Sequence, residues 1–404
     1  MGSEWKTTTI GEQVTLQRGI DITKVQQRPG KIPVVSSGGI SSYHDTAYAK
    51  APGVVLGRKG TIGTVFYIQD DYWPHDTSLW VRDFHGNNPR FVYYFFKSIS
   101  QDLASLDVGT ANPALNRNHV HPIAVQWPEL SDQHAIARIL GALDDKIELN
   151  RRMNRTLEEM AQAIFKSWFV DFDPVVARSQ GRQPYGMSAE TAELFPTVLH
   201  SEEEGIIPDG WRIGTVHEVF DLTMGQSPPG KTYNEAGDGI AFYQGRTDFG
   251  LRYPTPRVYC TAPTRYANTG DTLISVRAPV GDINMALEKC SIGRGLATIR
   301  HKLGHRSYTY YSMRFLRSEF DVFEGEGTLF GSISGEGFRN IKIIIPPPEV
   351  INEFENRSYP IDQSIENNER QSATLASIRD ALLPKLLSGQ LRVRNVDQYI
   401  EQSL

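Results

Sequence analysis

Residues 130–175 read LSDQHAIARILGALDDKIELNRRMNRTLEEMAQAIFKSWFVDFDPV. Between Ile136 and Trp168, mostly apolar residues follow one another at alternating steps of four and three. This a/d spacing, sustained over about four heptads, is typical of a long helix that pairs with another helix. At about 1.5 Å per residue, roughly 40 residues give a helix about 60 Å long. The seam positions are Ile136, Leu140, Leu143, Ile147, Asn150, Asn154, Leu157, Ala161, Ile164 and Trp168.

The same seam recurs 218 residues later, after the prolines of PPPEVIN (346–352). Proline and acidic residues favour a helix start there, as they do at PELSDQ (128–133). The second set is Phe354, Ser358, Ile361, Ile365, Asn368, Ser372, Leu375, Arg379, Leu382 and Leu386. We expect the two helices to pair with each other, mainly through Ile136, Leu140, Leu143, Ile147, Asn150, Leu157, Ile164, Ile361, Ile365, Asn368, Leu375, Leu382 and Leu386.

Asn150 and Asn368 hold equivalent places in the two seams. A buried amide in a helix pair costs stability but fixes register and partner. The alternative is that both amides lie at a bend or face the solvent. Because both copies keep an amide where an aliphatic side chain would pack better, we favour the buried interpretation.

The duplication reaches beyond the helices. GRKGTIG (57–63) aligns with VRAPVG (276–281), which places Lys59 over Arg277 and Gly63 over Gly281. HPIAVQWP (121–128) aligns with RNIKIIIP (339–346) at the same offset. A period of 218 residues is far too long for a solenoid, so the chain is predicted to contain two copies of one module.

The part of each copy before its helix is rich in glycine and in short runs of β-branched residues, such as GVVLG, TLISV and IKIII. These runs predict strands joined by long loops, with one helix over RFVYYFFKSISQDLASL (90–106). The expected fold is mixed α/β (α+β). It has two duplicated globular domains of strands and short helices, separated by two long antiparallel coiled-coil helices, with internal pseudo-twofold symmetry.

The predicted boundaries follow from these patterns. They are a first domain over 1–128, a first helix over 129–170, a linker over 171–209, a second domain over 210–346, a second helix over 347–391 and a tail over 392–404. The connecting stretch 171–210 carries eight acidic and two basic residues and suggests one short helix around 188–194.

Composition places few limits on function. The chain of 404 residues has a net charge of −5, yet residues 1–127 carry 12 Lys and Arg against 10 Asp and Glu, and residues 211–347 carry 16 against 13. Local faces decide attraction to a polyanion more than the total charge does. No apolar run of membrane-spanning length and no signal peptide are evident, so we expect the cytoplasm. Two cysteines form neither a disulfide framework nor a four-ligand zinc site.

Familiar catalytic motifs are missing from the sequence. GRKGTIG is not a P-loop, because its cations lie between glycines and a strand-like run follows. His119 and His121 in NHVHP have ligand-like spacing, but no acidic or cysteine partner is near in sequence, so no metal site is expected. No nucleophile elbow, zinc-protease or deaminase motif occurs. We expect no catalytic residues in this chain.

The helix that ends in WFVDFDP, together with IENNERQSATLASIRDALLPKLLSGQLRV (365–393), resembles the specificity subunit of type I restriction-modification systems. The resemblance covers essentially the whole chain. It implies that each globular domain is a target recognition domain for one half of a split, asymmetric site in double-stranded DNA. It also implies that the helices set the spacing and dock methyltransferase (modification) and restriction/translocase subunits. S-adenosylmethionine, ATP and Mg would then act on those partners, and this chain would bind no cofactor.

Base edges in DNA are read by polar and basic side chains, and phosphates are held by cations. Loops of the first domain supply Ser36, Ser37, Tyr43, His44, Arg58, Lys59, Thr61, His75, Asn112, Asn116, Arg117 and Asn118. Loops of the second supply Gln226, Lys231, Gln244, Arg246, Thr247, Arg277, Arg294, Ser332 and Ser334. Lys59 and Arg277 suit phosphate positioning, because residues shared by both copies do not encode different sequences.

Two other classes of function stay open on the sequence. One is a self-sufficient DNA-modifying or DNA-cleaving enzyme with an unrecognised active site. The other is an adaptor that binds protein and no DNA.

Overall fold

The computed structural model describes residues 5–106, 114–202, 205–320 and 331–393. Its contacts divide the chain into two compact units, one formed by residues 1–150 with 370–404 and the other by residues 151–369. Two 40-residue helices, α5 (Leu130–Phe169) and α12 (Pro348–Leu387), contribute to both units. Each unit therefore contains one globular domain and a segment of each long helix.

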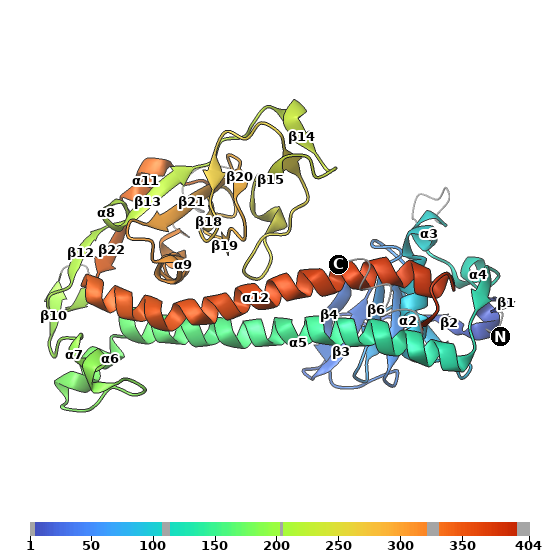
Figure 1. Ribbon diagram of the computed structural model, residues 1–404. Helices are drawn as coiled ribbons and strands as arrows, with labels where there is room; N and C mark the ends of the chain where they lie inside the picture. The colour runs from blue at the N-terminus through green and yellow to red at the C-terminus, as the bar shows by residue number, and fades with distance from the viewer. Residues whose placement is uncertain (1–4, 107–113, 203–204, 321–330, 394–404) are drawn as a thin grey trace. The chain divides into compact units, whose positions relative to one another are not determined.

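The first unit holds a four-stranded antiparallel sheet in the order β2-β8-β5-β6 and a three-stranded sheet in the order β4-β3-β7 (Figure 1). A separate antiparallel pair joins β1 to β9. The strands are β1 (Lys6–Thr9), β2 (Thr15–Arg18), β3 (Ile32–Ser36), β4 (Gly39–His44), β5 (Gly53–Gly57), β6 (Val65–Ile68), β7 (Trp73–Pro74), β8 (Ser78–Asp83) and β9 (Ala124–Trp127). The short helices are α1 (Ile10–Gln13), α2 (Pro89–Ser98), α3 (Ser100–Ser105) and α4 (Arg117–Val120).

The second unit repeats this plan with a larger second sheet. Its four-stranded antiparallel sheet has the order β13-β21-β18-β19, its five-stranded sheet the order β14-β16-β15-β20-β17, and β12 pairs with β22. The strands are β12 (Arg212–Thr215), β13 (Phe220–Met224), β14 (Tyr233–Asn234), β15 (Ile240–Tyr243), β16 (Tyr259–Cys260), β17 (Tyr266–Ala267), β18 (Thr272–Ser275), β19 (Ile283–Met285), β20 (Cys290–Ile292), β21 (Leu296–His301) and β22 (Lys342–Ile345). The helices are α8 (Val216–Val219), α9 (Arg306–Phe315), α11 (Gly335–Arg339) and the 3-10 turns η1 (Gly230–Thr232) and η2 (Arg246–Asp248).

Equivalent elements carry equivalent local chemistry. A capping box with Thr9 and Glu12 starts α1, and one with Thr215 and Glu218 starts α8. In such a box the threonine hydroxyl and the glutamate carboxylate accept hydrogen bonds from the backbone N–H groups that a helix start leaves without partners. Strands β9 and β22, 218 residues apart, close the corresponding pairs. The duplication predicted from the sequence is therefore confirmed in the fold.

Within each unit the two long helices lie side by side and antiparallel (Figure 1). In the first unit Asp144 contacts Arg379, and Asn150, six residues further along, contacts Gln371 and Ser372. In the second unit Asn154 contacts Asn368 and Glu369. Asn150 is 0% exposed, so the buried interpretation is confirmed for it, whereas Asn368 is only partly buried. Asn154, its partner on α5, is 1% exposed.

The seam residues also belong to the cores of the globular domains. In the first unit Ile136, Leu140, Leu382 and Leu386 share one buried cluster with aromatic residues of α2, such as Phe95. In the second unit Phe165, Trp168 and Phe169 pack against Phe354, Tyr308 and Trp211, so the end of α5 is buried inside this unit. The helices are thus part of each domain's core.

Two local expectations need correction. The helix expected over 90–106 is broken into α2 and α3 at Ile99. The connecting stretch holds two helices, α6 (Asp173–Ser179) and α7 (Ala189–Glu193), and a hairpin of β10 (Leu199–Glu202) and β11 (Gly205–Pro208), where one helix was expected. Pro174 in the first turn of α6 was the sequence signal for the additional helix.

Among the residues described, the helices are too short or too polar to cross a lipid bilayer.

Candidate nucleic-acid interface

The two aligned turns, 57–63 and 276–281, have the same construction. Each leaves a buried strand, β5 or β18, and ends on a glycine, Gly63 or Gly281, with φ of 84° in both. That glycine donates its backbone N–H back to the end of the strand, from Gly63 to Gly57 O at 3.3 Å and from Gly281 to Ser275 O at 2.8 Å. A positive φ of this kind suits glycine because it has no Cβ.

The cations of these turns, Lys59 and Arg277, are both exposed. Lys59 is anchored through its backbone N–H, which donates to Thr77 O at 3.1 Å. Arg277 is anchored by a β-bridge to Ser332. Since the backbone is fixed in each case, the turn presents its cation at a defined place on the domain surface.

In the first domain, four loop segments converge around the turn, and we call them the first loop cluster: residues 36–38, 57–64, 75–77 and 114–118. Ser37 O accepts hydrogen bonds from the hydroxyls of Thr61 (2.5 Å) and Thr64 (2.6 Å). Ser37 N donates to Thr77 Oγ1 at 3.3 Å. Leu115 N donates to Arg58 O at 2.9 Å, which joins the fourth segment to the turn.

Most of the candidates in the first domain lie in this cluster. Ser36, Ser37, Arg58, Lys59, Thr61, His75, Asn116, Arg117 and Asn118 belong to its four segments. Asn116 caps α4 by accepting from Asn118 N at 3.0 Å, so part of its hydrogen-bonding capacity is already used. Asn112 lies outside the described residues.

Tyr43 and His44 lie on β4 rather than in the loop cluster. Tyr43 is 54% exposed, whereas His44 is 3% exposed. The His44 ring accepts a hydrogen bond from Arg28 N at 3.0 Å and packs edge-on against Trp73. Its side chain therefore serves the interior of the domain.

The first loop cluster has its own ion pairs. Arg18 donates to Asp76 at 2.7 Å. Burial raises the pKa of Asp76, but the hydrogen bond from Arg18 and the neighbouring His75 outweigh it and leave that pKa below its usual value. Burial also lowers the pKa of Arg58. Arg18 was missed on the sequence because its partner Asp76 lies 58 residues further along the chain.

His75, Asp76 and Asp21 bring three possible metal-ligand atoms within 4.8 Å of one another. The charge of Asp76 is already neutralised by Arg18, however, and nothing else about these three side chains indicates a bound metal ion. The two histidines of NHVHP have different surroundings. His121 accepts from Leu16 N at 3.0 Å and has a pKa lowered by burial, while His119 is exposed.

The second domain has an equivalent gathering of loops, the second loop cluster, around Gly293–Gly295. Gln226 N donates to Ile292 O at 3.1 Å, and Gly295 N donates to Gln244 O at 3.1 Å. Val276 N donates to Gly295 O at 2.9 Å, so the Arg277 turn reaches the same point. The structure thus brings together Gln226, Gln244, Arg277, Arg294 and Ser332.

Arg294 lies between two glycines, Gly293 and Gly295. They allow close packing inside the domain. A Cβ at Gly295 would lie 2.4 Å from Gln244 O, and one at Gly293 would lie 3.0 Å from Gln244 Cα. Arg294 itself is exposed, and its backbone N–H donates to Ser227 Oγ at 3.2 Å.

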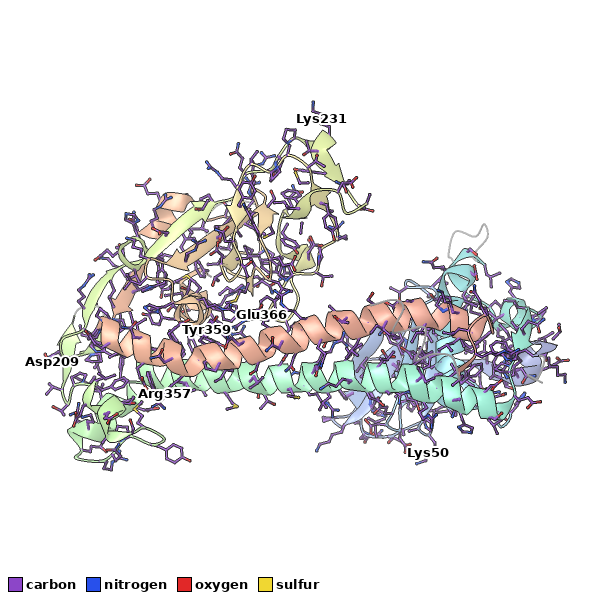
Figure 2. All side chains as sticks on the ribbon, in the orientation of Figure 1. Lys50, Asp209, Lys231, Arg357, Tyr359 and Glu366 are labelled. Carbon is purple, nitrogen blue, oxygen red and sulfur yellow. The ribbon has the colours of Figure 1, made fainter. Side chains whose placement is uncertain are left out.

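The remaining candidates of the second domain lie around this cluster or apart from it. Ser334 caps α11 by accepting from Gly337 N at 3.0 Å. Lys231, on η1, is exposed, and its side chain points away from the domain (Figure 2). Arg246 and Thr247 lie on η2, where Arg246 pairs with Asp282. Asp282 was not recognised on the sequence, because the pairing spans 36 residues.

Each domain is attached to the helices through an aspartate at equivalent positions, Asp144 and Asp362. In the first unit Tyr94 Oη donates to Asp144 Oδ2 at 2.7 Å, and Arg379 of α12 donates to Oδ1 at 2.6 Å. In the second unit Tyr311 Oη donates to Asp362 at 3.2 Å. The position of each domain on its helices is therefore fixed by polar contacts, partly buried in the first unit and buried in the second, as well as by packing.

In the first unit the arginine that pairs with this aspartate comes from a long helix, whereas in the second unit it comes from a loop of the globular domain. Arg252, from the loop that follows η2, is 1% exposed and donates to both Glu158 of α5 (2.7 Å) and Asp362 of α12. Its guanidinium lies 3.5 Å from the ring centroid of Tyr310. Burial alone would lower the pKa of Arg252, but Asp362, the tyrosines and Glu158 hold it well above the usual value.

Comparison with known proteins gives a consistent result. The sequence profile described as "Type I restriction modification DNA specificity domain" matches residues 2–159. A protein assigned as the specificity subunit of the type I restriction enzyme MjaX, from Methanocaldococcus jannaschii, is 29% identical over 286 residues, which cover 70% of this chain and 62% of that protein. The aligned region thus spans less than two thirds of this relative.

Two further relatives align over more of their own length. The MjaIX specificity subunit of the same organism is 28% identical over 324 residues, covering 76% of this chain and 70% of that protein. The HindI specificity subunit of Haemophilus influenzae is 27% identical over 355 residues and covers 74% of both chains.

Among solved structures, a type I restriction-modification S subunit from M. genitalium superposes with a TM-score of 0.61. The superposition covers 95% of this chain and 96% of that one at 17% identity, and it shows the same fold. The resemblance seen in the sequence is confirmed by these matches. Residues 2–159 thus match the type I restriction modification DNA specificity domain, and the chain as a whole is similar to specificity subunits of type I restriction-modification systems.

Proposed function

We propose that this chain recognises a two-part sequence in double-stranded DNA, with one half read by each domain. The observation that carries the proposal is the pair of matched turns. Turns that leave equivalent strands and end on equivalent glycines present Lys59 in one domain and Arg277 in the other, beside loop clusters whose other residues differ. Shared cations suit the DNA backbone, which is the same everywhere, and differing loops suit two different half-sites. The site is therefore asymmetric.

The partners of this chain are proposed from its similarity to type I specificity subunits. The chain docks methyltransferase (modification) subunits and restriction/translocase subunits, which carry the chemistry. S-adenosylmethionine, ATP and Mg act on those subunits, and the complex works in the cytoplasm. The similarity to type I specificity subunits supports this division of labour.

Binding of duplex DNA by the complex of this chain with its modification subunits tests the proposal. Fluorescence anisotropy is recorded over a range of salt concentrations with a labelled duplex. We expect affinity to fall steeply with salt, with a slope close to −0.9 per phosphate neutralised. Salt-independent or absent binding would point to an adaptor that contacts protein only. Methyl transfer or cleavage by the isolated chain would point to a self-sufficient enzyme.

A further inference from the structure

A cavity of about 780 Å³ opens in the second domain between η2, the Arg277 turn and α9. Three arginines line it, namely Arg246, Arg314 and Arg317, and two of them, Arg246 and Arg317, share the carboxylate of Asp282. Arg246 donates to Asp282 Oδ2, and Arg317 donates to Oδ1 at 2.6 Å. Three positive charges and one negative charge leave the described lining with a positive balance.

Asp282 is held in a fixed place. Its N–H donates to Ser275 Oγ at 2.9 Å, and its carbonyl oxygen accepts from Ser275 N at 2.8 Å. Gly281 just before it is packed so tightly that a Cβ would lie 2.8 Å from Phe320 Cβ. Because the acid does not move freely, it orients the arginines that pair with it.

Arg314 completes the cavity from α9, with 40% of its side chain exposed. Its nearest carboxylate oxygen, on Glu158, is 3.6 Å away, and the other oxygen of that carboxylate already accepts from Arg252. Arg246 is 53% exposed. A guanidinium has five N–H donors in a planar fork that matches the oxygens of a phosphate.

We propose that this cavity binds a phosphodiester of the DNA backbone, with Arg246 and Arg314 as the contacting residues and Asp282 as a positioning residue. The proposal rests on the proposed function, since it assigns the place where the second domain holds the duplex. A phosphate fits better than a base edge, because the arginines converge on a charged concavity rather than projecting singly from a loop.

The cavity distinguishes the second domain from the first. At the offset of 218, Asp282 corresponds to Thr64, Arg314 to Phe96 and Arg317 to Ile99. These three residues of the first domain have no charge, whereas the residue at the same offset from Arg246 is Arg28; among the described residues, the part of the site formed by Asp282, Arg314 and Arg317 therefore has no counterpart there. The two halves of the DNA are then held by unequal numbers of backbone contacts.

The test uses the assembled complex and a duplex that contains its recognition site. Arg246→Gln and Arg314→Gln should each weaken binding by about tenfold, equally for cognate and unrelated duplexes. Each should also reduce the slope of log affinity against log salt by about one. Arg182→Gln, in the linker, removes the same charge outside the recognition domain and should leave both quantities unchanged.

Asp282→Asn separates this proposal from a purely structural role of the cluster. Removing the negative charge should strengthen binding by about threefold at low salt, because a bound phosphate is no longer repelled. If the arginines serve only to hold Asp282, the variant would instead weaken binding as much as the arginine changes do. Thermal unfolding of each variant checks that the fold is kept.

A neutral methylphosphonate placed at one backbone position at a time identifies the phosphate. At one position the methylphosphonate should weaken binding by the wild type, whereas it should weaken binding by Arg314→Gln, which has already lost this contact, only slightly. No coupling at any position would overturn the proposal, as would a change in sequence preference or a loss of subunit assembly with DNA affinity intact. If the wild type binds no duplex at all, the proposed function itself fails, which is a different outcome.

Discussion

Asn368 donates a hydrogen bond from Nδ2 to Oδ1 of Asn154 at 2.8 Å. By the offset of 218, Asn368 is the counterpart of Asn150, and Asn154 is the counterpart of Ser372. In the first unit Asn150 Nδ2 donates to Ser372 Oγ at 3.2 Å. The same two seam positions therefore meet in both units, once as an amide pair and once as an amide and a hydroxyl. A contact of this kind specifies register, because a shifted helix would leave the buried amides without partners.

Replacement of Asn154 by leucine should destabilise the chain by about 1–3 kcal/mol, because Asn368 loses its buried acceptor. Asn154→Leu with Asn368→Leu should recover most of that loss but allow mixed oligomers, since the register is no longer specified. Urea unfolding of the single and double variants measures the coupling, and light scattering measures the oligomers. Additive effects with a uniform monomer would show that the pair has no such role.

Arg252→Met should cost about 3–5 kcal/mol, because it leaves Glu158 and Asp362 buried without a cation. The triple change Arg252→Met, Glu158→Gln and Asp362→Asn should restore much of the stability, since no uncompensated charge remains. Denaturant unfolding measures both. Arg300→Met, which breaks a partly exposed pair with Asp271, is the control and should cost much less. Equal losses for the two single variants would contradict the account.

His301 gives the second domain a sensitivity to acid. Its ring is buried against Phe220 and Tyr308 and close to His305, and burial lowers the pKa of His301 to about 4. The unfolded chain binds this proton near pH 6.5, so stability is complete above that pH and falls between 6.5 and 4, by about 1.4 kcal/mol per pH unit.

Unfolding of wild type and His301→Gln by urea at pH 7 and pH 5 measures the effect. The substitution should lower stability at pH 7 through lost packing but remove part of the decline toward pH 5. A decline of the same size in both proteins would show that His301 does not contribute. His305→Gln tests the neighbouring ring, whose pKa burial also lowers, in the same way.

Lys59→Ala and Arg277→Ala should each weaken DNA binding by a similar factor on every sequence and reduce the salt slope by about one. The reason is that the same turn presents both cations to a feature common to all DNA. Anisotropy with cognate and scrambled duplexes provides the measurement, and Lys50→Ala, which removes an exposed cation paired with Asp71, is the control. A shift in sequence preference would mean that the cations read bases.

The parts of the molecule that could be predicted are those whose sequences are periodic or repeated. The a/d spacing of α5 and α12 and the offset of 218 lead directly to the paired helices and the duplicated domains. The aligned glycines Gly63 and Gly281 likewise predicted equivalent turns, since only a small set of residues tolerates positive φ.

The contacts that position the domains on the helices could not be predicted from such patterns. Arg252 lies in an aperiodic loop and meets Glu158 and Asp362, which are 94 and 110 residues distant in sequence. His44 looked like a loop residue available to DNA, but the pairing of β4 with β3 places it in the interior. Strand order decides which loops converge, and single residues carry little information about strand order.

Methylated bases mapped across the host genome, with and without this gene, show whether the two domains read two different halves of one DNA site. We expect one asymmetric motif of two half-sites separated by a fixed spacer, and the loss of its methylation when the gene is deleted. An unchanged methylation pattern, or the loss of a continuous or palindromic motif, would contradict this expectation.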